Sequence, residues 1–296
     1  MSTTDPTAPE PPEPIDGHGA ATCRLLDELA ANATVAPVTQ RIDGWLCKFG
    51  PDLPFRRANA VSPAFGAGDD PSAAADALGE IEAWYRRRHR RVLVQVSSGD
   101  PSGAALDAQL ERRGYVIEAP VDILVAEGPA VQAAGSRASD GLRVSLEGRP
   151  GGPVEPPLVE TELGVDPGWA DRHRSVHAGD EGWRVRAVAL SEMLALLGPS
   201  GLAVAARSVD DVTVAIGFGV IERGWLGIFG MGTHPWWRRR GVAGALVGSL
   251  AVAARREGAT RLYLQAEVDN EAAQRLYAGL GFTRSHGYHY RVLDPS

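Results

Sequence analysis

The sequence is poor in cysteine, in long apolar runs and in net positive charge. Cys23 and Cys47 are the only cysteines in 296 residues, too few for a disulfide framework or a cysteine-rich metal site. We expect both to be small buried apolar side chains. The seven histidines do not combine with the two cysteines in a pattern typical of a metal site, so no metal is expected.

The missing apolar runs and the missing positive charge exclude further classes of protein. No stretch approaches the length that a membrane span needs. The formal net charge is −7, so nucleic acid and anionic membranes would repel the chain at long range and are not expected as partners. Residues 1–16 are proline-rich and acidic, and they predict a disordered tail rather than a signal peptide. Together these features predict a cytoplasmic protein.

The most informative stretch runs from Gly230 to Ala245, GMGTHPWWRRRGVAGA. The segment Trp225–Thr233, which overlaps the start of this stretch, is apolar and contains glycines. It predicts a buried strand with a bulge. His234-Pro235 ends that strand, and apolar residues at helical spacing begin at Val242. A helix is therefore expected to start near Gly241.

This helix start has the properties of an anion site. The first turn of a helix carries unpaired N–H groups and the positive end of the dipole, and Gly241 and Ala243 leave room for a phosphate to approach them. Arg238, Arg239 and Arg240 add charge in a planar form that suits phosphate. The alternative is a solvated basic helix start with no ligand.

A second motif follows the first. Thr260–Ala266 predicts a strand, and the next segment predicts a helix capped by Asn270 and ended by glycine. Together, R-x-x-G-x-A from Arg238 and N-x-x-A-x-x-L-Y-x-x-L-G-F from Asn270 resemble the GNAT superfamily of N-acetyltransferases. The resemblance covers roughly Leu142 to Leu293.

The resemblance implies a site for acetyl-CoA as cosubstrate. The backbone of the strand would pair with pantetheine, and the helix start would surround the pyrophosphate. The expected cofactor-binding residues are Met231, Gly232, Thr233, Arg238, Arg239, Arg240, Gly241, Val242, Ala243, Gly244 and Asn270. The resemblance also places Tyr277 beside the thioester sulfur, where a protonated phenol would act as general acid. Amides at the bulge would stabilise the oxyanion.

The general base is not fixed by the motifs. Many family members have a carboxylate on the strand before the phosphate loop, but Leu226–Thr233 contains none. Glu267, just after the second strand, is the candidate base. Glu222 and His234 are alternatives, and a water chain or the backbone is another.

The N-terminal half repeats part of this order of elements. Val92–Val96, Ala104–Arg113 and Val121–Val125 predict a strand, a helix and a strand, as in the C-terminal motif. Leu110 stands where Tyr277 stands in the later copy, and no R-x-x-G-x-[GA] precedes the helix expected near Ala74.

We therefore expect an α/β protein of two GNAT-like domains, each with a mixed, mostly antiparallel sheet flanked by helices. The expected parts are a degenerate copy over 17–126 that binds CoA poorly or not at all, a linker over 127–141, and the acetyltransferase domain over 142–296. Chance similarity of two strand-helix-strand units is the alternative. Within the first copy, Gly44–Phe49 and Arg57–Val61 are expected strands.

Acceptor recognition is expected from Pro157–Leu197, read as helical with breaks. The candidate pocket residues there are Trp169, His173, Arg174, His177, Asp180, Glu181, Trp183 and Arg184. The predicted function is acetyl transfer to a primary amine of a small molecule, peptide or protein. The alternatives are an acyl-CoA-binding sensor or scaffold and a mycothiol-type biosynthetic acetyltransferase. A tandem of this kind could be a monomer or a homodimer.

Overall fold

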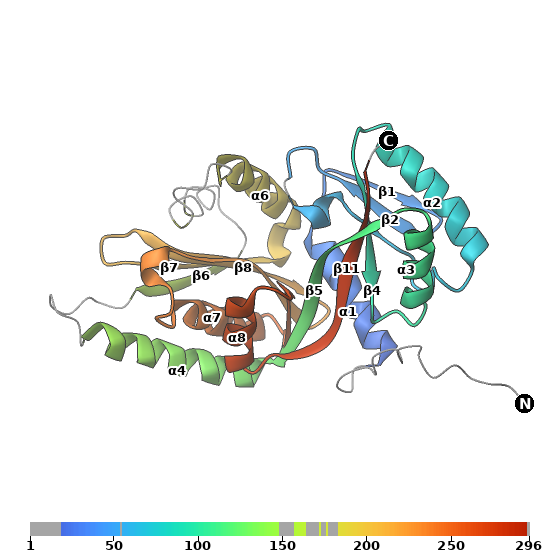
Figure 1. The fold of residues 1–296 in the computed structure, drawn as a ribbon. Coiled ribbons are helices and arrows are strands. Elements are labelled where there is room, and N and C mark those ends of the chain that lie inside the picture. Colours follow the sequence, from blue (N-terminus) through green and yellow to red (C-terminus); the bar gives the residue numbers. More distant parts are fainter. Residues whose placement is uncertain are drawn as a thin grey trace, which may run out of the picture.

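The computed structural model describes residues 19–53, 55–147, 157–163, 172, 176 and 183–294. In this part of the chain, eleven strands form one continuous sheet with helices on both faces (Figure 1). Neighbouring strands are antiparallel except for β3 with β4 and β9 with β10. The α/β class and the mixed, mostly antiparallel sheet are confirmed.

The strands follow the order β1-β2-β3-β4-β11-β5-β10-β9-β8-β7-β6 across the sheet. Their bounds are β1 Val38–Ile42, β2 Trp45–Phe49, β3 Val61–Ser62, β4 Val92–Ser97, β5 Val116–Glu127, β6 Leu158–Leu163, β7 Gly201–Arg207, β8 Thr213–Glu222, β9 Trp225–Thr233, β10 Arg261–Glu267 and β11 Thr283–Leu293.

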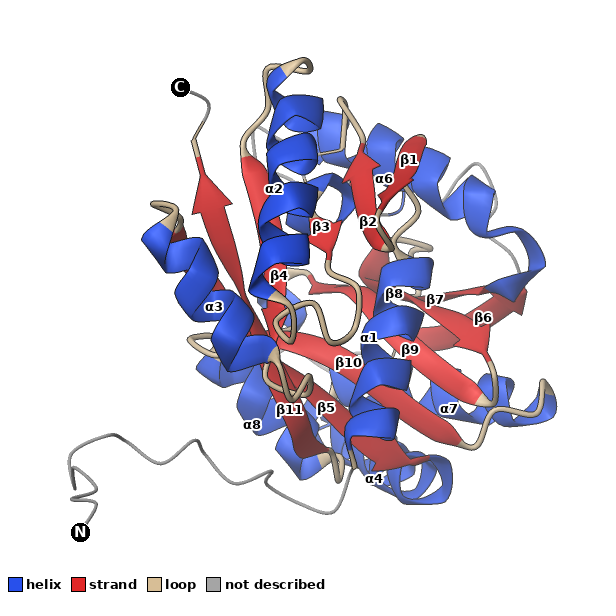
Figure 2. Cartoon of the chain, turned by 90° about the vertical axis from the view of Figure 1, so that its right-hand side faces the viewer, coloured by secondary structure: helices blue, strands red, loops and turns tan. Residues whose placement is uncertain are grey.

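The helices divide between the two faces because side chains alternate along each strand. In β4, for example, Leu93 faces the core under α1, whereas Val92 and Val94 face α2 and α3. Helices α1 and α6 pack on one face, and the remaining helices pack on the other. Figure 2 shows α1 lying in front of β9 and β10. Their bounds are α1 Ala20–Ala33, α2 Pro71–Arg86, α3 Gly103–Arg112, α4 Gly128–Glu147, α6 Trp183–Leu197, α7 Val242–Arg256 and α8 Glu271–Gly279, with single 3₁₀ turns η1 Arg56–Asn59, η2 Gly198–Ser200 and η3 Pro235–Trp237. Within the described residues, no helix combines the length and apolarity required to span a bilayer.

The two halves of the chain repeat one order of elements. The series α1-β1-β2-β3-α2-β4-α3-β5 in the first half matches α6-β7-β8-β9-α7-β10-α8-β11 in the second. The pairings match as well, since the only parallel neighbours, β3 with β4 and β9 with β10, occupy the same place in each series. The sequence predicted this repetition from its last three elements.

The halves exchange their last strands. Strand β5 of the first half pairs with β10, and β11 of the second half pairs with β4. The two exchanged strands pair with each other at the centre of the sheet (Figure 1). A buried ion pair fixes one exchange: Arg291 of β11 contacts Asp107 of α3 through Nε–Oδ1 and Nη2–Oδ2, both at 2.7 Å. The strands of the two halves therefore form one structural unit.

The segments that carry the C-terminal motifs fold as the sequence predicts. Strand β9 has the expected bounds, and α7 begins at Val242 with Gly241 as its N-cap. Asn270 caps α8 by accepting a hydrogen bond of 3.1 Å from the Ala273 amide. The apolar spacing and the capping residues together fixed these elements, because both signals are local.

Three segments differ from the sequence expectation. Residues 127–141, expected as a linker, lie almost entirely in α4, which packs against α7 around Gly135 and Gly248. Most of the expected strand Arg57–Val61 is the 3₁₀ turn η1 instead. The first part of the expected helical region, Leu158–Leu163, is the edge strand β6. The expected tail, 1–16, lies outside the described residues.

Candidate active site

Strands β9 and β10 run side by side for only part of their length. They pair in parallel from Trp225 with Arg261 to Ile228 with Leu264, and no pairing continues beyond that point. β10 remains paired with β5 as far as Glu267, so β9 is the strand whose second half has an open edge. The open edge belongs to Phe229–Thr233, the segment expected to bind pantetheine.

A β-bulge lies at the start of this open segment, as the glycines predict. Across β8, Ile216 faces Gly232 and Phe218 faces Phe229, so Gly230 and Met231 together oppose the single residue Gly217. Gly230 has a φ of +60°, which favours glycine. The bulge turns backbone amides away from the regular ladder, next to the opening between the strands.

The start of α7 leaves its first turn without a side-chain cap. Gly241 is the N-cap with a φ of +85°, and no side chain accepts a hydrogen bond from the first turn. A Cβ at this position would lie 2.7 Å from the Ala138 carbonyl oxygen, so the contact with α4 also requires glycine. The first turn holds no acidic residue. An anion can therefore use these amides.

The three arginines before α7 are held in different ways. Arg238 donates from Nε to the Thr233 carbonyl at 3.0 Å, which ties the loop to the end of β9. Arg239 has a φ of +58°, a conformation that a non-glycine residue rarely adopts. The Arg240 guanidinium lies over the rings of Trp236 and Trp237, at 5.2 and 5.8 Å from their centroids.

Tyr277 lies on the α7 and α8 face of the sheet. Its ring is 7% exposed and packs edge-on against Phe282, with centroids 5.7 Å apart. Met231 packs against the same core cluster. Burial raises the pKa of Tyr277 to about 12. The phenol is therefore protonated at neutral pH, as a general acid must be.

Glu267 lies on the opposite face, level with the bulge. Extending the register from Ile228 and Leu264 by three residues brings it opposite Met231. It lies four residues after Tyr263 in the strand and so shares the α1 face with that residue. Its carboxylate is 53% exposed and pairs with Arg56 Nη1 at 3.3 Å. The two candidate catalytic groups thus lie on opposite sides of the opening.

The structure separates Glu222 from the opening and gives His234 a structural contact. Glu222 pairs with Trp225 at the far end of β9, about 20 Å from Met231 at the rise of a strand. It accepts hydrogen bonds from Asn32 Nδ2 at 3.0 and 3.2 Å. His234 supports the loop by accepting from the Trp236 amide through Nδ1 at 3.3 Å. Glu267 is the candidate that the strand register brings to the site.

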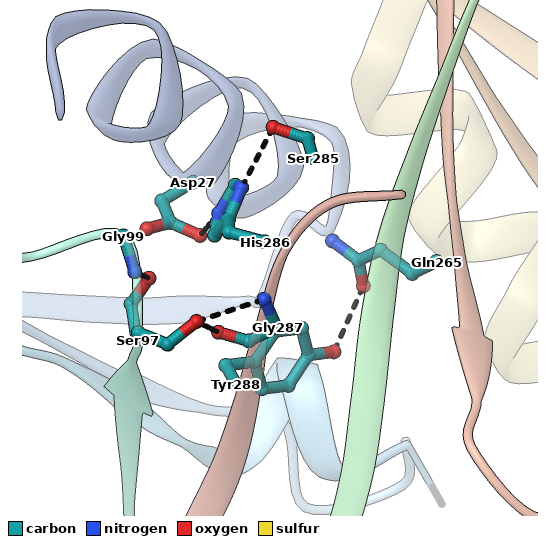
Figure 3. Close-up of polar contacts among 9 residues, drawn as sticks. Asp27, Ser97, Gly99, Gln265, Ser285, His286, Gly287 and Tyr288 are labelled. Atoms are coloured by element: carbon teal, nitrogen blue, oxygen red, sulfur yellow. Dashed lines mark hydrogen bonds and ion pairs between the residues drawn. The ribbon is translucent and has the colours of Figure 1, made fainter. Parts of the chain in front are cut away.

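The sequence did not predict the contribution of the N-terminal half to this face. Arg56 comes from η1, and Ala58 of the same turn is buried with Tyr263 and Tyr288. The Tyr288 hydroxyl donates to Gln265 Oε1 at 3.0 Å (Figure 3). These contacts depend on strand exchange between distant segments, and no local sequence signal indicates it.

Most of the residues expected to recognise the acceptor lie outside the described residues: Trp169, His173, Arg174, His177, Asp180 and Glu181. Trp183 and Arg184 begin α6, where the structure describes their backbone alone. Nearby described residues show where the region lies. Val176 is buried, and Met193 and Leu194 of α6 pack in the core that contains Phe229. The backbone of α6 therefore covers the same face as Glu267.

The corresponding helix start in the N-terminal half is occupied. Asp70 caps α2, and its Oδ1 accepts from the amides of Ser72 and Ala73 at 3.0 and 3.1 Å. In the loop before it, the Gly66 amide donates to Asp100 at 2.9 Å and the Gly68 amide to Ser102 at 3.1 Å. These side chains fill the positions where α7 keeps its amides open.

Comparison with known proteins agrees with this geometry. Residues 173–282 match the model of the Acetyltransferase (GNAT) family. The fold resembles a GCN5-related N-acetyltransferase from Kribbella flavida at 18% identity, covering 95% of this chain and 97% of that one, with a TM-score of 0.63. A tandem GNAT protein from the clavulanic acid biosynthesis pathway is 12% identical, with coverages of 95% and 91% and a TM-score of 0.63. No curated protein matches the chain.

Proposed function

We propose that this protein is an acyltransferase that transfers an acetyl group from acetyl-CoA to a primary amine. The match of residues 173–282 to the GNAT family supports the proposal. The acceptor amine belongs to a small molecule, a peptide or a protein. No metal takes part in this reaction as we propose it.

One observation carries the proposal: the open edge of β9 leads directly into the uncapped first turn of α7. Strand amides can pair with an extended amide-containing chain, and a helix start can bind a diphosphate. Pantetheine joined to a diphosphate has this order of groups. Its thioester would then lie near the bulge at Gly230 and Met231, with Tyr277 on the same side.

The positions of the acid and the base fit direct attack. The amine nitrogen approaches from the Glu267 face, forms a bond to the thioester carbonyl carbon and passes a proton to Glu267, directly or through water. Amides at the bulge stabilise the oxyanion. As the carbon–sulfur bond breaks, Tyr277 donates its proton to the departing thiolate. The products are an amide and free CoA.

Two measurements on the full chain test the proposal. Titration calorimetry should detect binding of acetyl-CoA and of CoA. Thiol release, followed with a panel of small primary amines and peptides, should then be steady and depend on the amine. An absence of binding to either nucleotide would overturn the proposal.

The role of Glu267 has a separate test. Glu267→Gln should remove the acid limb of the pH profile of kcat/KM, since a neutral amide cannot accept the proton. Glu222→Gln is the matched control, because Glu222 lies at the far end of β9. If both variants keep the acid limb of the wild-type protein, a water chain or the backbone takes the place of a carboxylate base.

A second function is favoured by one feature. The segment Leu226–Thr233 carries no carboxylate, so a protein with the same nucleotide site could bind acyl-CoA without turnover. Tight binding of acetyl-CoA with no thiol release for any amine would favour this sensor or scaffold over the enzyme.

A further inference from the structure

A cavity lies in the N-terminal half. It has a volume of about 460 Å³ and opens between α1, the turn from β1 to β2, the ends of β3 and β4, and the start of α3. Cavities of this size hold small-molecule ligands in many proteins. Its wall is built from well-packed elements rather than from a long loop.

The cavity occupies the same place in its half as the opening between β9 and β10 does in the other. Strand β3 pairs with β4 only between Val61 and Val94, and the strands then diverge. Ser62 and Phe65 line one side of the cavity, while Gln95 and Ser97 line the other. The N-terminal half has therefore kept an opening between its parallel strands.

The ligand of this cavity differs from a nucleotide diphosphate. The amides that would bind the diphosphate already donate to Asp70, Asp100 and Ser102. The two carboxylates among these residues would also repel a diphosphate. The opening is thus kept, while the anion site at the helix start is filled.

The carboxylates that line the cavity have interaction partners of their own. Among its carboxylates, Asp27 contacts His286 Nε2 at 3.0 Å (Figure 3) and Glu28 contacts Arg223 at 3.2 Å. Asp100 accepts from the amides of Gly66 and Ser102. Each of these carboxylates therefore has a partner of its own.

The two guanidinium groups at the cavity have no such partner. Arg24 lies over the Phe65 ring at 5.1 Å, and Arg41 donates to the Gly44 carbonyl at 3.2 Å. Within the described part of the chain, neither arginine pairs with a carboxylate. Gln95 also lines the cavity. Apolar contacts come from Leu46 and Leu106.

We propose that this cavity binds a small organic monocarboxylate with an apolar or aromatic body. The carboxylate would accept hydrogen bonds from Arg24 and Arg41, whose planar groups suit it. The body would lie against Leu46, Leu106 and Phe65. The site is separate from the proposed acetyl-CoA site and does not depend on it.

The test uses three probes of similar shape on the full chain. Benzoate, neutral benzamide and cationic benzylamine are compared by ligand-observed NMR and calorimetry. Benzoate should bind with a Kd of about 1 mM or tighter, and at least about tenfold more tightly than the other two. Saturating CoA should leave the affinity for benzoate unchanged, which separates this cavity from the site in the other half.

Variants locate the bound probe. Arg24→Gln combined with Arg41→Gln should weaken benzoate binding about tenfold or more, while Arg255→Gln, an exposed change at the end of α7, should not. Melting temperatures close to that of the parent protein show that the variants are folded. Equal binding of benzoate and benzamide, preference for benzylamine, displacement by CoA, or an unaffected double variant would each overturn the proposal.

Discussion

Tyr277 combines a buried ring with a hydroxyl that has no hydrogen-bond partner among the described residues. Its ring packs with Phe282, and burial alone raises its pKa to about 12. Removing the oxygen therefore leaves no unsatisfied partner behind in the described structure. Removing the hydroxyl therefore tests a role in proton transfer while the packing of the ring is kept.

Replacing Tyr277 with Phe should lower kcat by about 100-fold, with little change in the affinity for acetyl-CoA. The free energy of unfolding should change by less than about 1 kcal/mol, since the ring is kept. Steady-state kinetics and urea denaturation measure the two effects. An unchanged kcat would remove Tyr277 from the mechanism.

His286 connects the two halves through a titratable pair. Burial by itself would lower its pKa, but hydrogen bonds and charge interactions with Asp27 and Cys23 outweigh that effect and raise the pKa from 6.5 to about 9. Ser285 completes the surroundings of the ring with a contact of 3.1 Å to Nδ1. The folded state therefore holds this proton more tightly than the unfolded chain does.

The raised pKa of His286 makes the free energy of unfolding depend on pH. The stabilisation is fully present below pH 6.5 and is lost as the pH rises through about 9. Its size is on the order of 3 kcal/mol. The difference in unfolding free energy between the parent protein and His286→Asn should therefore shrink between pH 6 and pH 9.5. Taking the difference cancels the opposing contribution of buried Lys48, whose pKa is lowered to about 8.

At the residue scale, the sequence predicted the positions that local motifs specify. Gly241 and Asn270 cap helices as expected, because capping depends on near neighbours in the chain. Arg56 was not predicted beside Glu267, since that pair joins residues far apart in the sequence. The acceptor side of the site is formed by such distant contacts.

At the scale of elements, the first turns of α7 and α2 differ in one feature. The amides of α7 have no side-chain cap, whereas Asp70 fills those of α2. A carboxylate near a helix start stabilises the helix but competes with a bound anion. One substitution can therefore separate helix stability from nucleotide binding.

Ala243→Glu, in the first turn of α7, should weaken acetyl-CoA binding about tenfold or more by charge repulsion. Its melting temperature should stay equal or rise slightly, because an acidic residue there favours the helix dipole. Val252→Glu adds the same charge at an exposed position of α7 and is the control. Calorimetry decides the matter: equal affinities in the two variants would place the nucleotide elsewhere.

Elements whose apolar residues recur at regular spacing were predicted well. Elements that depend on packing against other parts of the chain were not. Strand β9 and helix α7 have clear apolar patterns and appear with the expected starts. Helix α4 has a small-residue, polar composition that suggested a linker. In the structure its Gly135 packs closely against Gly248 of α7, so the small side chains serve helix contact.

At the scale of the whole molecule, the exchanged strands make each half depend on the other. The buried Arg291 side chain is 5% exposed, and its partner Asp107 lies on the helix of the other half. Removing Arg291 takes away both of its contacts with the Asp107 carboxylate and leaves that carboxylate with His289 Nε2 at 2.7 Å. The ion pair therefore stabilises the contact between the two halves.

Arg291→Gln should lower the unfolding free energy by about 3 kcal/mol or more. Arg275→Gln is the matched control, because its pair with Glu271 is 72% and 78% exposed and should contribute less than about 0.5 kcal/mol. Unfolding should remain a single transition in both variants. Two separate transitions in the parent protein would contradict the dependence of the halves on each other.

The strand exchange has a consequence for synthesis on the ribosome. The edge of β4 that receives β11 stays bare until residues 288–293 have emerged, because Val92 pairs with Leu293. An uncovered strand edge invites pairing with other chains. The nascent polypeptide thus carries an aggregation-prone edge from the synthesis of β4 until β11 is made, and chaperone demand should be greatest in that interval.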